Sequence, residues 1–301
     1  MSGEVTLLVN PVAGQGRGRR AAVPVARTLR DAGIAVRVLV GLDAEDAVRR
    51  ASEAVAAGTG ALVAVGGDGM AALALRAVAG TATPLGLIGI GTGNDVARAL
   101  GLPVRDPVAA AGVVAEALKR GSPRAVDLGR VGDTWFGSVL ATGFDARVND
   151  RANRMRWPRG GPRYDLAVVA ELATLRPSPY RISLDEGPWR DLEATLVAVG
   201  NGPSYGGGMR ICAEARMDDG LLDVTVVGPC RRGTLLRVFP RVYRGTHLSH
   251  PVVSRYRARR VALAAPGVVG YADGERVGPL PLVAECRPGA VRVLTDAVPA
   301  P

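Results

Sequence analysis

Lysine is almost absent from this sequence of 301 residues: Lys119 is the only one, so arginine carries nearly all of the positive charge. No lysine is therefore available for a phosphate-binding P-loop, for a Schiff base or for the strand lysine of a protein kinase. Histidine is also scarce. His247 and His250 have no metal-like partners in the sequence, so we expect surface or core roles for both.

Cysteine is also scarce, and long apolar runs are absent. Cys212, Cys230 and Cys286 are too few and too scattered for a disulfide framework or a zinc site, which fits a reducing cytoplasm. No signal peptide precedes Val5, and no apolar run reaches about 18 residues. We therefore expect a cytoplasmic protein that does not span a membrane but is free to lie on the inner face of one.

Aromatic residues make up 4% of the chain against 48% hydrophobic residues overall, so the cores must be built mainly from Ala, Val and Leu. The formal net charge is +10 and the sequence pI is near 10.4. This balance predicts attraction to anionic partners. A nucleic-acid partner is not expected, because the sequence has no basic stripe interleaved with aromatic residues.

Residues 1–124 alternate short apolar runs with helix-like stretches, which predicts a parallel sheet with helices on both faces. Ligands of such sheets bind beyond the carboxyl ends of the strands. The expected strands are Val5–Val9, Val36–Val40, Ala61–Val65 and Pro84–Ile90, and the expected helices are Arg19–Ala32, Ala44–Ala57, Met70–Ala79, Val96–Leu100 and Val108–Lys119.

From residue 125 to residue 301 the segments are short, rich in Val, Thr and Leu, and bounded by Gly, Pro and Asp. This pattern predicts an antiparallel β domain, whose last residues are free to return to the first domain. A helical insertion is expected over Arg163–Leu175. The expected strands include Ala125–Val131, Trp135–Ala141, Arg181–Leu184, Ala194–Val199 and Leu222–Val227.

Glycine-rich turns follow three of the strands predicted in the first domain. The turn Asn10–Gly18 is weak evidence alone, because a plain flexible turn has the same composition. In Gly66-Gly67-Asp68-Gly69, glycines let the backbone approach a phosphate, and the following helix adds its positive end. An acid in such a turn suggests that Mg²⁺ lies between Asp68 and the phosphate. The alternative is a tight turn that Asp68 caps.

The third turn, Gly91-Thr92-Gly93-Asn94-Asp95, repeats this design with glycines, a hydroxyl, a potential cap and an acid before a helix. Taken together, the second and third turns resemble those of the diacylglycerol kinase catalytic family, which includes sphingosine, ceramide and bacterial lipid kinases. Further matching motifs are Asn10-Pro11, Gly143-Phe144-Asp145-Ala146, Asp218-Asp219-Gly220-Leu221-Leu222-Asp223 and Asp273-Gly274-Glu275.

The resemblance implies a two-domain fold: a doubly wound nucleotide-binding domain, a β-sandwich domain that takes the lipid, and an active site with ATP and Mg²⁺ between them. Asp273 matches the general base, although Asp273-Gly274 alone would predict a hairpin turn. The positions implied to bind nucleotide are Asn10, Gly41, Gly66, Gly67, Asp68, Gly69, Met70, Ala71, Ala72, Thr92, Gly93 and Asn94.

The resemblance also implies a second metal position, formed by Asp219 with the backbone carbonyls of Arg216 and Leu221. A plain turn between strands is the alternative. Asp95 and Asp127 are candidates to join Asp68 around Mg²⁺. The chain departs from the family at Met70, Ala72 and Leu73, where polar residues are usual, at Gly41, where a Thr often contacts nucleotide, and at Gly89 in place of a Pro. These losses could weaken ATP binding.

A basic stretch runs from Arg147 to Arg163 and includes Arg154, Arg156, Trp157 and Arg159. It predicts contact with an anionic phospholipid surface, with Trp157 at the headgroup level, and a solvated loop is the alternative.

The function implied by the resemblance is transfer of the ATP γ-phosphoryl group to diacylglycerol at a membrane surface. Other lipid hydroxyls (sphingoid base, ceramide, phosphatidylglycerol), an NAD kinase, and a relative without turnover remain open. A homodimer is a possible assembly. The Gly91–Asp95 turn and the Asp273 motif argue against the NAD kinase.

Overall fold

The computed structural model describes residues 3–9, 17–155, 157 and 161–296, and the chain divides into two compact units. Unit 1 comprises Met1–Leu128, Met217–Asp219 and Arg287–Pro301, and unit 2 comprises Gly129–Arg216 and Gly220–Cys286. Two strands, β5 (Arg124–Val131) and β16 (Leu282–Val293), pass from one unit into the other along their length.

The sheet of unit 1 is parallel over its first four strands, in the order β2 (Val36–Val40), β1 (Val5–Val9), β3 (Ala61–Gly66) and β4 (Leu85–Gly89). All residues of β1, β3 and β4 are buried, as expected for strands covered on both faces. The end of β16 adds to β4, with Val293 opposite Leu85.

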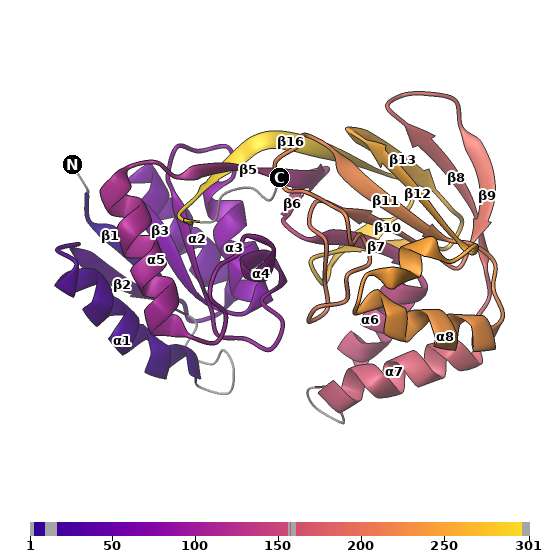
Figure 1. The fold of residues 1–301 in the computed structure, drawn as a ribbon, viewed down its shortest axis with the longest axis horizontal. Helices are drawn as coiled ribbons and strands as arrows, with labels where there is room; N and C mark the ends of the chain where they lie inside the picture. Colours follow the sequence, from indigo (N-terminus) through magenta and orange to yellow (C-terminus); the bar gives the residue numbers. More distant parts are fainter. Residues whose placement is uncertain (1–2, 10–16, 156, 158–160, 297–301) are drawn as a thin grey trace. The chain divides into compact units, whose positions relative to one another are not determined.

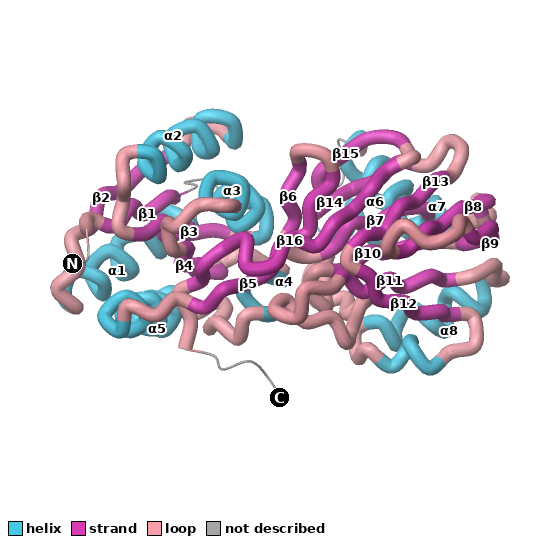
Figure 2. Tube along the Cα trace, turned by 90° about the horizontal axis from the view of Figure 1, so that it is seen from above, coloured by secondary structure: helices cyan, strands magenta, loops and turns pink. Residues whose placement is uncertain are grey.

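Helices cover both faces of this sheet, and Figure 2 shows α1 (Arg17–Asp31) and α5 (Pro107–Arg120) on one side and α2 (Ala44–Ala56) and α3 (Asp68–Val78) on the other. Aliphatic side chains of α1 and α5 form one core with alternate residues of β1 and β3. Local signals set the helix ends: the Asp106 side chain accepts a hydrogen bond from Ala109 N at the start of α5.

Unit 2 contains a six-stranded antiparallel sheet in the order β12-β11-β10-β7-β14-β15. A second antiparallel set packs against it and consists of β13, β8, β9 and the first part of β16. The remaining strands are β6 (Thr134–Phe136), β7 (Val139–Gly143), β8 (Ser178–Leu184), β9 (Arg190–Ala194), β10 (Leu196–Gly200), β11 (Leu222–Val227), β12 (Val253–Ala258), β13 (Arg260–Ala264), β14 (Val269–Ala272) and β15 (Glu275–Pro279).

Three helices cover the outer face of the six-stranded sheet in unit 2: α6 (Phe144–Arg154), α7 (Gly161–Ala173) and α8 (Arg232–Val242) (Figure 1). The helical insertion expected after Arg163 is α7. The solvated loop considered for the basic stretch is wrong over Arg147–Arg154, because these residues lie in α6. The sequence did not predict α8, which has no side-chain cap and contains Pro240.

The predicted fold class is therefore confirmed: a doubly wound parallel sheet in one unit and an antiparallel sandwich in the other. None of the helices in the described residues is long and apolar enough to cross a bilayer.

Candidate functional site

The turn between β3 and α3 depends on its glycines. Gly67 occupies the N-cap position of α3 and makes no side-chain cap. A Cβ at Gly66 would collide with the Met70 side chain, so glycine allows the chain to pass directly from strand to helix. The alternative role of Asp68 as the cap of this turn is wrong, because Asp68 is the first residue of α3 itself.

The Asp68 carboxylate joins the two glycine turns of unit 1. Its Oδ2 accepts a hydrogen bond from Asn94 N at 2.8 Å, and its Oδ1 accepts one from Asp95 N at 2.6 Å. These amides begin the short helix α4 (Asp95–Ala99), so the carboxylate lies at the positive end of that helix. Asp68 thus fixes the Gly91–Asp95 turn against the end of β3.

The Gly91–Asp95 turn also closes on itself. The Asn94 side chain accepts a hydrogen bond from Gly91 N and donates one to Gly91 O, both at 2.9 Å. Asn94 adopts φ 59°, a left-handed conformation that Asn tolerates better than most residues. A Cβ on Gly91 would lie 2.7 Å from Gly67 Cα, so the two turns meet backbone to backbone. The crevice between them measures about 10 Å³. A nucleotide would therefore have to lie over the turns, outside this crevice.

Two carboxylates converge on Gly93. A Cβ at this residue would collide with Asp68 Oδ2 and lie 3.3 Å from Asp95 Oδ2. Burial, and next the negative charge of Asp95, raise the pKa of Asp68, although the two amide hydrogen bonds lower it. A divalent cation with oxygen ligands suits such a pair, because it would relieve the repulsion between the two carboxylates.

The other residues expected to bind nucleotide fall into two groups. Met70, Ala71 and Ala72 are at most 9% exposed and pack their side chains into unit 1, so only their backbone could meet a ligand. Gly69 and Thr92, in contrast, are exposed. Asn10 lies outside the described residues.

Gly41 is buried, and a Cβ there would lie 2.6 Å from Ala47 Cβ in α2. The helix therefore leaves no room for the side chain that relatives often carry at this position.

The predicted metal positions outside the glycine turns have structural partners. Asp127 Oδ1 accepts a hydrogen bond from Gly289 N at 2.8 Å and is buried. Asp219 is half-buried in a turn that belongs to unit 1, whereas Arg216 and Leu221 are assigned to unit 2. Across the described residues, no group of three or more His, Cys, Asp or Glu side chains is arranged to hold a metal ion.

Asp273 occupies the two-residue turn between β14 and β15, as the local sequence predicts, with Ala272 paired to Glu275. Its φ is 49°. The carboxylate accepts hydrogen bonds from Gly137 N at 2.7 Å, Ser138 N at 2.9 Å and Val139 N at 3.2 Å. These donors lie 134 to 136 residues away in the sequence, so the turn is fastened to a distant segment.

The segment held by Asp273 has a second anchor that the sequence did not reveal. Asn201 is fully buried, its side chain donates to Gly137 O at 3.0 Å, and its N donates to Ser138 O at 2.9 Å. The available signal was the polar run Asn201-Gly202-Pro203 directly after the apolar strand β10, the same pattern that identified the glycine turns of unit 1. Asp273 and Asn201 together fix the segment from two sides.

Asp145 of the Gly143–Ala146 motif faces a cavity between α6, α8 and the sheet of unit 2. The Tyr205 hydroxyl donates a short hydrogen bond to its Oδ2. Burial raises the pKa of Asp145 to about 6, although the Tyr205 hydrogen bond and Arg147 lower it. This carboxyl therefore titrates closer to neutral pH than an ordinary aspartate.

Three arginines of the basic stretch have acidic partners. Arg147 and Arg151 both pair with Glu171, and Arg154 pairs with Asp150 at 2.7 Å. Trp157 is 81% exposed. Arg156 and Arg159 lie outside the described residues.

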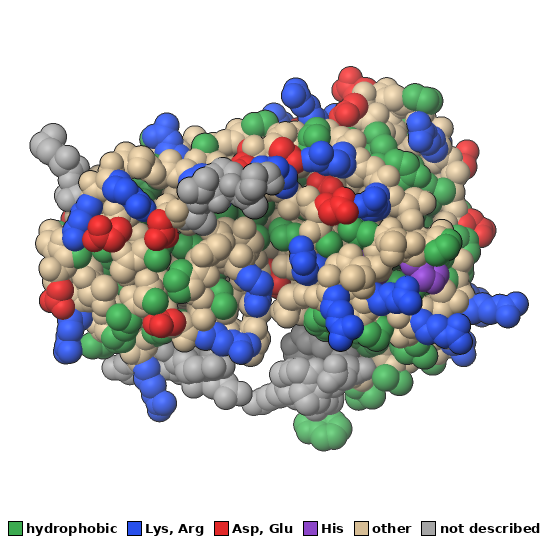
Figure 3. Space-filling model, viewed as in Figure 1, with side chains coloured by type: hydrophobic (Ala, Val, Ile, Leu, Met, Phe, Trp, Pro, Cys, Tyr) green, Lys and Arg blue, Asp and Glu red, His purple; other side chains and the backbone are tan. Residues whose placement is uncertain are grey.

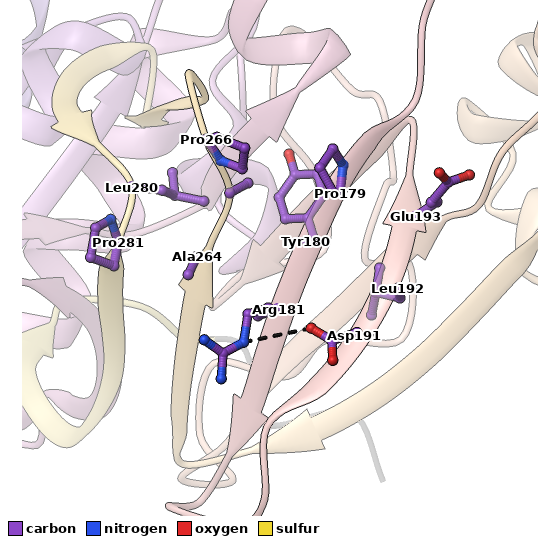
Figure 4. Close-up of a pocket in the computed structure, with 11 residues that line it drawn as sticks. Pro179, Tyr180, Arg181, Asp191, Leu192, Glu193, Ala264, Pro266, Leu280 and Pro281 are labelled. Atoms are coloured by element: carbon purple, nitrogen blue, oxygen red, sulfur yellow. Dashed lines mark ion pairs between the residues drawn. The ribbon is translucent and has the colours of Figure 1, made fainter.

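A cavity of about 680 Å³ lies in unit 2 (Figure 4). Its walls are mostly apolar, with Tyr180 and Pro266 at one end and an Arg181–Asp191 ion pair of 3.6 Å at the other. No residue predicted to bind nucleotide or metal lines it.

Comparisons with known proteins support the same family. A family model described as "Diacylglycerol kinase catalytic domain" matches residues 4–131, and one described as "YegS C-terminal NAD kinase beta sandwich-like domain" matches residues 138–295. A diacylglycerol kinase of Mycobacterium tuberculosis is 46% identical over 297 residues, covering 97% of this chain and 95% of the relative. A "probable lipid kinase YegS-like" of Stenotrophomonas maltophilia is 32% identical, covering 88% of each.

Among solved structures, a putative diacylglycerol kinase from Bacillus anthracis aligns with a TM-score of 0.78 at 23% identity, covering 97% of each chain. An NAD kinase from Archaeoglobus fulgidus in complex with ATP aligns with a TM-score of 0.53 at 11% identity, covering 96% of this chain and 92% of that one. At these identities, both structures support the fold alone.

Proposed function

This chain belongs to the diacylglycerol kinase catalytic family, and from that membership we propose that it transfers the γ-phosphoryl group of ATP to the hydroxyl of diacylglycerol, giving phosphatidic acid. The observation that carries the proposal is the pair of glycine turns that Asp68 fastens together at the carboxyl ends of β3 and β4. Phosphoryl transfer depends on positioning and on charge stabilisation, and preorganised backbone amides supply both.

The nucleotide phosphates would lie over the exposed side of these turns, at Gly67, Gly69 and Thr92, near the first turn of α3. The unpaired amides at the start of a helix and its dipole favour anionic groups there. Asp68 and Asp95 would hold Mg²⁺, which neutralises phosphate charge when it is bound. The raised pKa of Asp68 supports this assignment, because a nearby cation would favour its ionised form.

Asp273 would accept the proton of the lipid hydroxyl as the phosphoryl group transfers. Its three amide hydrogen bonds fix the carboxylate in one orientation, which supports a role in which it meets a single substrate group. We place the enzyme at the cytoplasmic face of a membrane, because its proposed acceptor is a membrane lipid and the net charge of +10 favours an anionic surface.

The test is turnover with radiolabelled ATP and a lipid panel in anionic vesicles. We expect label in diacylglycerol and little in sphingoid base, ceramide or phosphatidylglycerol. Label in one of these other lipids would show that the protein is a lipid kinase with an acceptor other than diacylglycerol. Absence of label in every lipid, with ATP binding measurable by calorimetry, would instead support a relative without turnover, which the buried Met70 and Ala72 side chains motivate.

A further inference from the structure

One segment of unit 2 carries arginines with no acidic residue of its own to offset their charge. From Val224 to Ala272 there is no Asp or Glu, although the whole chain contains 28 acidic residues. The same segment contains nine arginines: Arg231, Arg232, Arg237, Arg241, Arg244, Arg255, Arg257, Arg259 and Arg260. Its charge is therefore comparable with the net charge of +10 of the entire protein.

Helix α8 and the residues that follow it present part of this charge on an amphipathic face. Leu235, Val238 and Val242 are buried against the sheet of unit 2. The opposite face exposes two large apolar side chains beside the basic ones, with Leu236 57% and Tyr243 51% exposed. Its exposed arginines are Arg237, Arg241 and Arg244. We call Leu236, Arg237, Arg241, Tyr243 and Arg244 the α8 face.

The arginines of the α8 face differ from three arginines on strands β12 and β13 that have acidic partners. On strands β12 and β13, Arg255 pairs with Glu214 at 2.5 Å and Arg260 with Glu285 at 3.2 Å. In the described part of the chain, no acidic side chain forms an ion pair with the α8-face arginines. On the side of the molecule seen in Figure 3, Lys and Arg side chains gather over α8 without acidic ones among them. Among the described residues, no acidic side chain therefore balances the positive charge of the α8 face by an ion pair.

We propose that the α8 face is a docking surface for the headgroup layer of a bilayer rich in anionic phospholipid. Planar guanidinium groups bind phosphate through two parallel hydrogen bonds, which suits Arg237, Arg241 and Arg244. Leu236 and Tyr243 match the side chains that amphipathic helices place at the boundary between headgroups and acyl chains. The choice of a lipid partner rests on the proposed function. It differs from the predicted contact at Arg154–Arg159, whose described arginine is already paired with Asp150.

The decisive experiment is sedimentation of the full-length protein with phosphatidylcholine vesicles containing increasing phosphatidylglycerol, without ATP. A triple variant carries Arg237→Gln, Arg241→Gln and Arg244→Gln. Each arginine near an anionic surface contributes about 5-fold in partitioning, so we expect about 100-fold weaker binding. The matched control carries Arg20→Gln, Arg27→Gln and Arg30→Gln, which removes three exposed arginines from helix α1 and leaves the same net charge.

Wild type and control should bind the anionic vesicles equally well, and added salt should weaken this binding. The α8-face variant should bind the same vesicles much more weakly. Equal loss in both variants would show that net charge alone attracts the protein and would overturn the proposal, as would unchanged binding of the α8-face variant. Binding of both variants to duplex DNA is measured in parallel. If the α8-face variant loses DNA binding but keeps vesicle binding, the proposal is also overturned. Thermal unfolding confirms that both variants fold.

A second variant tests the apolar part of the surface. Leu236→Ser with Tyr243→Ser keeps every charge, and we expect it to lose the binding that persists at high salt. Unchanged high-salt binding would refute membrane insertion by these side chains. Turnover of a short-chain diacylglycerol in neutral detergent micelles separates the two proposals. If micellar turnover is absent in wild type, the kinase proposal fails while the vesicle result stands. If it is normal in every variant but the vesicle binding does not depend on α8, only the docking proposal fails.

Discussion

Asp68 in unit 1 and Asp273 in unit 2 hold their surroundings by the same device but sit in different electrostatic settings. Each carboxylate accepts backbone amides from a segment distant in sequence: two from the Asn94–Asp95 turn, and three from Gly137–Val139. Asp68 has a second carboxylate, Asp95, beside it. Asp273 instead lies in a partly exposed hairpin turn among amide donors.

The difference separates two chemical tasks. A repelling pair of carboxylates favours a cation, and hence the phosphate charge that a cation accompanies. A single carboxylate fixed by three amides suits the orientation of one hydroxyl group. Changes at Asp68 should therefore affect metal and nucleotide binding, and changes at Asp273 should affect turnover.

The largest expected effect follows Asp273→Asn. Removal of a general base lowers turnover by about 10²–10⁴-fold, and we expect ATP affinity measured by calorimetry to stay close to that of wild type. The variant amide would also turn an N–H toward one of the backbone donors, which costs about 2 kcal/mol in the free energy of unfolding.

Asn201→Ala is the matched control, because it loosens the same Gly137–Val139 segment without removing the carboxylate. A turnover loss of equal size in both variants would show that Asp273 acts only by holding this segment. Near-normal turnover of the Asn variant would remove Asp273 from the mechanism.

Gly93→Ala should disrupt the hydrogen bonds by which Asp68 holds the two glycine turns together. The new methyl group collides with the Asp68 carboxylate, so we expect a loss of about 4 kcal/mol in the free energy of unfolding from overpacking and broken hydrogen bonds. ATP affinity should fall with it. Gly69→Ala serves as the control, because a Cβ there meets nothing within 4 Å. The prediction fails if urea denaturation gives the two variants the same stability.

Asp145 extends the comparison to a second carboxyl with a raised pKa. A group whose pKa rises from 3.8 to about 6 on folding stabilises the protein below pH 3.8, and this contribution is lost as pH rises through 6. The free energy of unfolding of wild type relative to Asp145→Asn should therefore fall by about 2 kcal/mol between those pH values. Denaturation curves across pH 3.5 to 7.5 measure this difference, and parallel pH profiles would contradict it.

Asp219→Ala should give the smallest effect. We expect it to change only the gain in stability that added Mg²⁺ provides. If Asp219 helps to bind Mg²⁺, wild type gains about 1.4 kcal/mol of stability at a Mg²⁺ concentration ten times the dissociation constant, and the variant does not. Thermal unfolding with Mg²⁺ or with a chelator provides the measurement. Identical metal responses of both proteins would leave Asp219 as a residue of a plain turn.

Local patterns predicted much of the fold, because they depend on neighbours in sequence. The buried strand Ala61–Val65 and the glycines after it were predicted, since a run of apolar residues ending in glycines has few other structures, and the structure extends this strand to Gly66. Helix α8 was missed because Pro240 interrupts its pattern and Arg231 gives no side-chain cap. Helix α6 was missed for a similar reason, since it begins after Gly143 at φ 76°.

The predicted site was less accessible from sequence. The Asp68 bonds span 26 and 27 residues and those of Asp273 span 134 to 136, so no local rule could find their partners. The sequence suggested that Asp68 faces a cation, while the structure shows that both of its oxygens also bind backbone amides. Met70 is buried, so the packing at this position does not require the polar residue that is usual in the family. The effect of Met70 on ATP binding stays a prediction.

The passage of β16 from unit 2 into unit 1 bears on the order of events during synthesis. Gly80 N donates to Ala290 O, Leu294 N donates to Leu85 O, and Leu294 belongs to the core formed by α1 and α5. A ribosome makes this segment only after all of unit 2, so β4 emerges early and waits for its neighbour with an open edge. The edge of β4 is therefore exposed to mispairing for the time needed to translate about 200 residues, from Gly89 to Val293, or roughly 10–40 s. A chaperone that shields β4 during that interval would act on a vulnerability set by topology.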